Sequence, residues 1–412
     1  MPNTLVRVDL LQAETIRKKE KKTIIKQSAD TRYQGQLRKK GDTVKVQIFP
    51  RIGANVSNTT GGNITDTSGN AIAGQQVTVA NEDLKINQVY QVGTLVADIE
   101  EIQNDFNIAS KIAEEFAQTS AQNEDEFVAS KVHLGLEANK IGFRAPITLS
   151  TSNAYDNITQ MTQALEEQNA FENTNIFINP KYKRFLKRED IFDSTEKGVE
   201  IRMNGFVGKI DGFRIFSTNN LPHVRLLSIA TQVTDNDTVT LAGLVPDQTT
   251  TARYQEQLVV FKAVTTATAA GDVAKGANVA AFQQNLLDAV NNTGTPGSGT
   301  YIAISASDRI ALTNALVAME TSWTGNTNNV QSARTVTMSE TFTDVTDSFG
   351  DDAFLIFSVD NKAINAVFQM DKMWTHPVLQ STTHQINHEK VYDGTVFSEN
   401  NKGISSVEIK VT

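Results

Sequence analysis

The sequence predicts an α+β fold with more than one hydrophobic core, and three observations lead to this prediction. The 412 residues exceed the length at which a single core usually stops growing. Segments with the two-residue period of strands alternate with segments that have helical spacing. Hydrophobic residues make up 39% of the chain and charged residues 21%, so most of it is expected to fold rather than to stay disordered.

The composition excludes several kinds of chemistry. Cysteine is absent, which rules out disulfides, thiolate metal sites and a cysteine nucleophile. The first eleven residues reach Arg7 and Asp9 before any apolar run of signal-peptide length, and no run of 18 apolar residues occurs. We therefore expect a soluble, unsecreted chain with no membrane partner.

Residues 1–40 are expected to form a basic N-terminal arm. They hold eleven Lys or Arg and four acidic residues, a local charge of +7 in a chain whose net charge is −9. Such an arm suits a polyanion or an acidic neighbour, whereas a solvated helix face is the alternative interpretation. The arm residues predicted to face the interior or a neighbour are Arg17, Lys18, Lys19, Lys21 and Lys22.

A long β-hairpin is predicted next. Residues 42–49 and 76–92 alternate apolar and polar side chains, and residues 52–76 between them hold five Gly, four Asn and six Ser or Thr. A loop of this length is usually functional or disordered, so we expect it to lie on a neighbouring subunit, with an unpartnered surface hairpin as the alternative. The predicted inter-subunit contacts at its tip are Asn58, Thr60, Gly61, Gly62, Asn63 and Asp66.

Residues 95–134 are predicted to form one helix, because apolar side chains recur at steps of three, four and seven with no Pro or Gly between them. Thr94 is the expected N-cap and Gly135 the expected stop. Forty residues correspond to roughly 60 Å, so the helix is expected to be the spine of a flat, elongated subunit, with a coiled coil as the alternative. Its acidic residues are expected to be solvated: Glu114, Glu115, Glu124, Asp125 and Glu126.

Mixed helices and strands follow to the C-terminus. Asn179 and Pro180 are a typical N-cap and first helical residue. The segment 223–345 is rich in Thr, Ala and Asn and is interpreted as an insertion. Predicted helices cover 155–168, a short segment after Pro180, 278–290, 307–323 and 361–368. Predicted strands cover 175–178, 199–206, 213–217, 258–264, 301–304, 353–357 and about three runs that reach Val411.

The sequence offers no convincing catalytic, metal or cofactor site. His384 and His388 have ligand-like spacing but no evident third ligand, and Asp235-Asn236-Asp237 lacks the Gly and the distal Glu of a calcium loop. No phosphate-binding loop, nucleophile elbow or dinucleotide fingerprint is present. A hydrolase that uses His376 or His388 stays open as an alternative, although no nucleophile can be named for it.

The order of the predicted elements, a basic arm, a long hairpin, a very long helix and then an α/β lobe, resembles the Hong Kong 97-like fold of tailed-phage major capsid proteins. The local sequence adds to the likeness, which covers residues 1–222 and 350–412. The motifs that carry it are Asn179-Pro180-Lys181-Tyr182, the run Gly208-Lys209-Ile210-Asp211-Gly212-Phe213-Arg214-Ile215, the run Ser217-Thr218-Asn219-Asn220-Leu221-Pro222, Asp360-Asn361-Lys362-Ala363-Ile364 and Tyr392-Asp393-Gly394.

The resemblance implies a division of the chain into the parts of that family. The expected parts are an N-terminal arm (1–40), an extended loop (41–92), a peripheral domain with the spine helix (93–150 and 370–412), an axial domain (151–222 and 346–369) and an insertion domain (223–345).

The resemblance also implies a non-enzymatic shell protein, located in the virion capsid after assembly in the host cytoplasm. Expected partners are copies of itself in hexamers and pentamers, a separate scaffolding protein, a portal, a decoration protein and non-specifically bound packaged DNA. Two alternatives are an encapsulin-like compartment shell and a β-rich adhesion or binding module, the latter suggested by segment 223–345.

Overall fold

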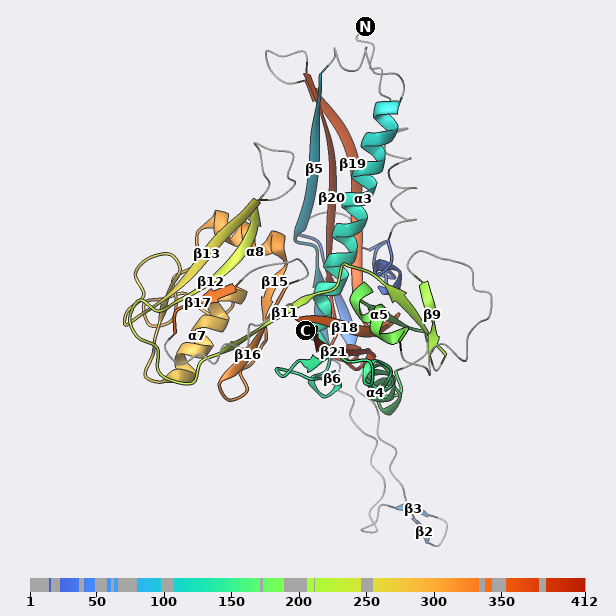
Figure 1. Cartoon of the computed structure of the whole chain (residues 1–412), viewed down its shortest axis with the longest axis horizontal. Helices are drawn as coiled ribbons and strands as arrows, with labels where there is room; N and C mark the ends of the chain where they lie inside the picture. The colour runs from blue at the N-terminus through green and yellow to red at the C-terminus, as the bar shows by residue number, and fades with distance from the viewer. Residues whose placement is uncertain are drawn as a thin grey trace.

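The computed structural model gives the chain a mixed α+β architecture with an elongated outline (Figure 1). A long helix lies along a narrow three-stranded sheet, a ten-stranded sheet occupies the middle, and a four-stranded sheet with its own helices lies to one side. The structure describes residues 15, 23–36, 41–48, 58–60, 63–65, 80–97, 107–170, 173–188, 206–210, 212–245, 255–332, 338–342, 353–377 and 383–411.

The narrow sheet is antiparallel, with β20 between β19 and β5. Helix α3 runs along it in Figure 1 and packs onto it through a small apolar cluster of Ala113, Phe116, Met373 and Ile386. A turn of 3-10 helix, η2, continues α3 to Leu134. The bounds are β5 (Gln88–Ala97), α3 (Asn107–Ser130), η2 (Lys131–Leu134), β19 (Asn365–Pro377) and β20 (Thr383–Thr395).

The ten-stranded sheet holds the largest core. Its main path runs β15-β16-β11-β18-β8-β10-β9, and the C-terminal strand β21 pairs with β18 on one side and with β6 and β7 on the other. The strands are β6 (Lys140–Ile141), β7 (Ile147–Thr148), β8 (Thr174–Ile178), β9 (Phe206–Ile210), β10 (Phe213–Ser217), β11 (His223–Ser228), β15 (Val317–Met319), β16 (Thr327–Ser332), β18 (Ala353–Asp360) and β21 (Ile404–Lys410).

Two helices add to this core. In α4 (Ala154–Glu167), Ile158, Met161 and Leu165 are buried at helical spacing. Helix α5 (Pro180–Leu186) begins as predicted, because the Asn179 side chain accepts a hydrogen bond of 2.8 Å from the Lys181 backbone N–H.

A second lobe is built around a separate core that contains Phe261, Phe282 and Tyr301. Its sheet has the order β14-β13-β12-β17, and two helices accompany it. Leu227, Met319 and Val330 of the ten-stranded sheet extend into the same core, so the two sheets are packed together at this border. The elements are β12 (Thr238–Val245), β13 (Gln255–Val264), β14 (Asp272–Ala274), α7 (Val279–Asn291), α8 (Ala306–Ala315) and β17 (Met338–Glu340).

The predicted hairpin consists of two strand pairs. β1 (Thr43–Ile48) pairs with β4 (Ala80–Lys85) over six residues, from Thr43 opposite Lys85 to Ile48 opposite Ala80. β2 (Asn58–Thr60) pairs with β3 (Asn63–Thr65). The predicted second run at 76–92 is therefore divided within the described residues, since β4 ends before Ile86 and β5 begins at Gln88.

The start of the spine helix was placed wrongly. Thr94 and Leu95 lie in β5, where the backbone pairs with Ile386 and Gln385 of β20. This long-range pairing outweighs the local helical pattern, and residues 98–106 lie outside the described part. The described part of the helix, α3, has 24 residues, which correspond to roughly 36 Å. Gly135 does end η2, but in an extended conformation rather than as a left-handed stop.

Three further predictions in the C-terminal half are wrong. Residues 361–368 form a turn and the start of β19 instead of a helix, because Ala366 and Phe368 pair with Gly394 and Tyr392. The helix expected over 307–323 stops at Ala315, where Leu316 adopts a left-handed conformation with φ 54°. The strand expected at 301–304 is reduced to one bridge between Tyr301 and Val273.

The remaining elements agree with the sequence. Strand 213–217 is β10, 175–178 lies in β8, 353–357 lies in β18 and 258–264 lies in β13. The helix predicted over 278–290 is α7, whose N-cap Asn278 accepts a hydrogen bond from the Ala281 N–H. Of the predicted strand 199–206, only Phe206 is described, and it begins β9.

Candidate functional site

The hairpin tip projects away from the rest of the molecule. Figure 1 places β2 and β3 at the far end of the chain's long dimension, apart from every other labelled element. Asn58, Thr60 and Asn63 lie on these strands, with Thr60 opposite Asn63. Gly61, Gly62 and Asp66 lie outside the described residues. A two-stranded hairpin is at best marginally stable alone, so this pair is well suited to stabilisation by another surface.

The base of the hairpin is anchored to the body. Leu84 and Ile86 are buried with Val391 and Phe397, while Val44 of β1 packs against this cluster. The backbone closes the base with two hydrogen bonds, from the Gly41 N–H to the Ile86 carbonyl (2.7 Å) and from the Ile86 N–H to the Asp42 carbonyl (3.1 Å). The ladder therefore leaves the body in a fixed direction.

The five basic arm residues predicted to make contacts, Arg17, Lys18, Lys19, Lys21 and Lys22, lie outside the described residues. The arm is described from residue 23 to residue 36, and we call this segment the strap. It crosses from α3 to the start of β19, and η1 (Lys26–Ser28) is its one element of regular structure. Its contacts decide how the arm is attached.

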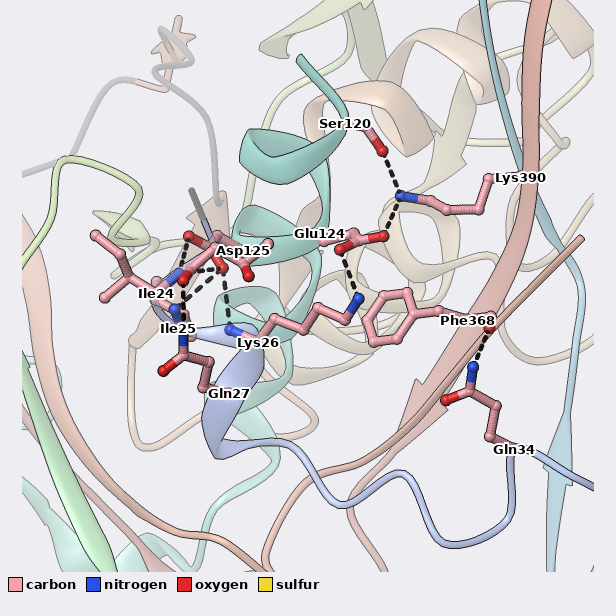
Figure 2. A network of polar contacts seen from close by, with 11 residues as sticks. Ile24, Ile25, Lys26, Gln27, Gln34, Ser120, Glu124, Asp125, Phe368 and Lys390 are labelled. Carbon is pink, nitrogen blue, oxygen red and sulfur yellow. Dashed lines mark hydrogen bonds and ion pairs between the residues drawn. The ribbon is translucent and has the colours of Figure 1, made fainter. Parts of the chain in front are cut away.

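Asp125 of α3 holds the first turn of the strap (Figure 2). Its Oδ1 accepts hydrogen bonds from the Ile25 and Lys26 backbone N–H groups, each at 3.0 Å, and its Oδ2 accepts one from the Ile24 N–H at 3.0 Å. These are the orphan donors at the start of η1, so a side chain of one helix caps another segment a hundred residues away.

The capping carboxyl is almost completely buried. Asp125 is 1% exposed, and burial raises its pKa to about 6, while the three backbone N–H donors oppose the shift and neighbouring Glu124 adds to it. The N–H groups therefore compensate only part of the desolvation of the carboxylate.

Glu124, which precedes Asp125 in α3, joins the strap to the narrow sheet. Its Oε2 lies 2.8 Å from Lys26 Nζ of the strap, and its Oε1 lies 2.8 Å from Lys390 Nζ of β20. Lys390 also donates to Ser120 Oγ at 3.1 Å. Glu124 and Lys390 have side chains 0% and 1% exposed, so this ion pair is isolated from water.

Aromatic rings surround the two ammonium groups. Lys26 Nζ lies 4.6 Å from the centroid of Phe368, and Lys390 Nζ lies 5.4 Å from that of Tyr392. Phe127 meets Tyr392 edge to face at 4.7 Å. Ring faces carry negative charge density and attract desolvated cations, which adds to the ion pairs.

The strap then pairs with the start of β19. The Asp30 N–H donates to the Ile364 carbonyl at 2.7 Å, and the Ala366 N–H donates back to the Asp30 carbonyl at 3.0 Å. Gln34 Nε2 donates to the Phe368 carbonyl at 2.7 Å. The strap is thus fixed to both α3 and β19, and Ile25 is fully buried in the main core.

The prediction that all five acidic residues of the spine helix are solvated is therefore wrong for three of them. Glu114 and Glu115 are exposed, whereas Glu124, Asp125 and Glu126 are at most 5% exposed. The signal was present in the sequence, because Glu124 continues the three- and four-residue spacing of Ala113, Ala117 and Ala121 along the buried side of α3. Acidic residues on that stripe indicate buried partners rather than solvent.

The described part of the chain forms no metal centre. No group of three or more His, Asp or Glu side chains there is arranged to hold a metal. His388 is buried and stacked on Phe116, with ring centroids 6.2 Å apart. Asp237 closes the Asp235–Asp237 turn by accepting from the Thr234 N–H. The described helices include none with the length and hydropathy of a membrane span.

Comparison with known proteins gives fold-level similarity. No family model matches the chain, and no curated protein matches it. Among solved structures, the chain is similar to one from Mycobacterium phage Che8, with 14% identity over 93% of this chain and 90% of that one and a TM-score of 0.46.

Two other similar structures are the capsid of Cyanophage P-SCSP1u and a virus-like particle from Pyrococcus furiosus. The first has 12% identity and a TM-score of 0.47 and covers 95% of this chain and 89% of that one. The second has 11% identity and a TM-score of 0.39 and covers 97% and 99%. Since these identities and TM-scores are low, the function proposed below depends on this chain's own residues and contacts.

Proposed function

We propose that the protein is a structural shell protein with a Hong Kong 97-like fold, which assembles with copies of itself into the head of a tailed phage. The observation that carries the proposal is the projecting hairpin on a rigid base. Its β2–β3 pair lies apart from the body, and the strands of its base, β1 and β4, are anchored to the body through the Leu84 and Ile86 cluster.

The hairpin is suited to reach over a neighbouring copy. Such a contact joins two different surfaces, and heterologous contacts of this kind close into rings when the rotation between subunits permits. Hexamers and pentamers are the expected rings. Many weak contacts of this type become collectively strong, because each first contact raises the effective concentration for the next.

The other predicted parts have roles in the same mechanism. The narrow sheet with α3 serves as the peripheral domain, and the ten-stranded sheet contributes the axial domain. The basic residues Arg17, Lys18, Lys19, Lys21 and Lys22 face the interior, where they meet a scaffolding protein or packaged DNA through salt-sensitive contacts. Portal and decoration proteins complete the expected set of partners.

The experiment that tests self-assembly is negative-stain electron microscopy of the purified protein, alone and with a candidate scaffolding protein. We expect closed shells or rings under at least one condition. A monodisperse monomer under both conditions would contradict the proposal and would favour the adhesion-module alternative.

The contribution of the hairpin is tested by replacing residues 49–79 with Asn-Gly. Because Ile48 and Ala80 are the last paired residues of the ladder, a two-residue turn fits between them. We expect this variant to melt at the temperature of the wild type but to form no rings or shells. The matched control is Gly299→Ala, where a Cβ meets nothing within 4 Å and assembly should continue.

A phage head and a cargo compartment differ in what the shell encloses. The +7 arm favours nucleic acid as the content. Particles isolated from the native source should therefore contain DNA that is protected from nuclease. Particles filled with a protein cargo would assign the chain to the encapsulin-like alternative instead.

A further inference from the structure

A buried polar cluster joins the C-terminal strand β21 to β15 and β16 at the border of the second lobe. Glu408 of β21 is 1% exposed, and Glu320, which follows β15, is 5% exposed. Asn328 and Asn329 of β16 are both fully buried. The cluster is separate from the strap and the hairpin, so the proposed assembly mechanism does not account for it.

The charged groups that face the two carboxyls can be named for the described part of the chain. Lys140 of β6 lies 3.3 Å from Glu320 Oε2 and also donates to the His133 carbonyl at 2.8 Å. The Arg144 guanidinium donates to the Ser322 carbonyl. Glu137 adds further negative charge near Glu320. Burial lowers the pKa of His133 to about 4, so His133 is neutral at higher pH.

Among the described residues, Glu320 has an ion-pair partner and Glu408 has none. Glu320 has Lys140 as its ion-pair partner and also accepts from Gln331 Nε2 at 3.0 Å. Within the described part of the chain, the donors to Glu408 are uncharged: the Asn329 Nδ2 amide at 2.5 Å and the Arg144 backbone N–H at 3.1 Å. An ionised Glu408 would be a buried negative charge beside Glu320, which is costly.

An unsatisfied acceptor lies next to Glu408. Asn329 donates through Nδ2 to Glu408 Oε1, but its Oδ1 is buried without a hydrogen-bond donor. Buried acceptors are rarely left unpaired. A proton on Glu408 supplies the missing donor, because a carboxylic acid and a primary amide can each donate one hydrogen bond to the other.

We propose that Glu408 carries a proton at neutral pH and donates it to Asn329 Oδ1, so that an acid–amide pair fastens β21 to β16 and makes this joint sensitive to alkali. The pair closes a contact between the last strand of the chain and the strand that enters the second-lobe core through Val330. Removal of the proton breaks one hydrogen bond and places two negative charges side by side.

The electrostatics of the cluster agree with this geometry. Burial, reinforced by the charge of Glu320, raises the pKa of Glu408 from 4.5 to about 8. Because the folded-state pKa is the higher one, the stabilisation is complete below pH 4.5, declines as the pH rises, and is lost once the pH passes about 8.

Infrared spectroscopy of the full-length wild-type protein tests the protonation state directly. We expect a component of the protonated-carboxyl band that disappears with a midpoint near pH 8 and is absent from Glu408→Gln. The control Glu399→Gln changes an exposed glutamate and should leave the band in place. A wild-type band that disappears with the midpoint of an ordinary glutamate would overturn the proposal, whether or not the variant folds.

Hydrogen exchange at the β16 backbone amides tests whether the joint between β21 and β16 opens more readily as the pH rises. After correction for intrinsic exchange, the opening constant of the wild type should rise about tenfold per pH unit up to the pKa of Glu408 and then level off. Glu408→Gln keeps both hydrogen bonds of the pair without a charge, so its opening constant should rise less steeply with pH than that of the wild type. Parallel pH dependence in the two proteins would refute a protonated Glu408.

Discussion

Two adjacent residues of α3, Glu124 and Asp125, hold different parts of the chain in place. Asp125 accepts backbone N–H groups of the strap, whereas Glu124 joins two lysines from segments on either side of it. Because both side chains are buried, each is stabilising only as long as its partners are present. Their substitutions should therefore have different consequences.

Asp125→Ala removes the acceptor for the Ile24, Ile25 and Lys26 N–H groups and leaves these donors unpaired. We expect a loss of about 3 kcal/mol in the free energy of unfolding, measured by denaturant titration. Asp83→Ala, at an exposed position of β4, is the control and should change stability by less than about 0.5 kcal/mol. Equal midpoints for Asp125→Ala and wild type would show that the strap is held without this cap.

Lys390→Met leaves Glu124 with only one of its two lysine partners. We expect a loss of about 3 kcal/mol, since breaking a buried pair leaves an uncompensated charge. Lys26→Met should cost less, roughly 1 kcal/mol, because the Lys26 side chain is 22% exposed. A double-mutant cycle with Glu124→Gln measures the coupling, and additive effects would contradict a direct pair.

The residue scale was only partly predictable from the sequence. The N-cap Asn179 was predicted from its neighbours in sequence and is confirmed, whereas Asn278 was placed inside the helix that it caps. Glu124 and its partner Lys390 are 266 residues apart in sequence, so no local pattern connects them. The helical stripe does indicate that Glu124 is buried, but it cannot indicate which cation lies beside it.

At the scale of elements, the contact between α8 and β12 depends on one glycine. A Cβ at Gly243 would lie 2.6 Å from the Ala311 Cβ and 2.7 Å from the Ala311 backbone carbon. Backbone cannot move aside as a flexible side chain can, so any larger residue must push α8 away from the sheet. Gly243 is thus required for the close approach of these two elements.

Gly243→Ala is expected to destabilise the second lobe by about 1–3 kcal/mol through overpacking. Thermal unfolding followed by the fluorescence of Trp323, which packs against the second-lobe core, reports this change. Gly297→Ala is the matched control, since the nearest atom to its Cβ would be 3.7 Å away. An unchanged melting temperature for Gly243→Ala would mean that α8 can shift without cost.

Two of the errors in element prediction have the same physical origin. Residues 94–97 and 365–368 are compatible with helix by local spacing, yet both pair with β20, which lies far away in sequence. Strand pairing satisfies their backbone groups across the sheet, and that gain exceeds the small differences in intrinsic propensity. By contrast, α4 has buried residues at strict helical spacing and was predicted correctly.

At the scale of the whole molecule, the strap separates two functions of the arm. Residues 23–36 are part of the fold, because they are bound to α3 and β19. The five basic residues before the strap are proposed to act between molecules. The effect of the five basic charges on assembly can therefore be tested separately from the effect of the strap on stability.

Replacing Arg17, Lys18, Lys19, Lys21 and Lys22 with Gln should leave the unfolding midpoint of the monomer unchanged. Shell assembly with a scaffolding protein or DNA should weaken and should lose much of its salt dependence, since each neutralised cation removes a counterion-releasing contact. Light scattering at several salt concentrations measures this. Wild-type salt dependence in the variant would exclude these residues from the contact.

The order of the main elements could be predicted from the sequence, but the borders of the domains could not. The hairpin base and the helix along the narrow sheet follow from periodicity and composition, and the resemblance placed them in one order. The border of the segment 223–345 could not be predicted, because β11, β15 and β16 belong to this segment but pair within the ten-stranded sheet. In sequence, β15 and β16 lie between α8 and β17 of the second lobe. The division into domains therefore stays a prediction.

The strap also has a consequence for the time at which the fold is completed. Gln34 and its partner Phe368 are 334 residues apart, which at ribosomal rates of about 5–20 residues per second corresponds to roughly 20–70 s of synthesis. Until β19 emerges, the strap has no strand to pair with, and the main core lacks part of its sheet. A chain that ends before β19 thus keeps an open core and an unattached arm, and both features distinguish it from a finished chain.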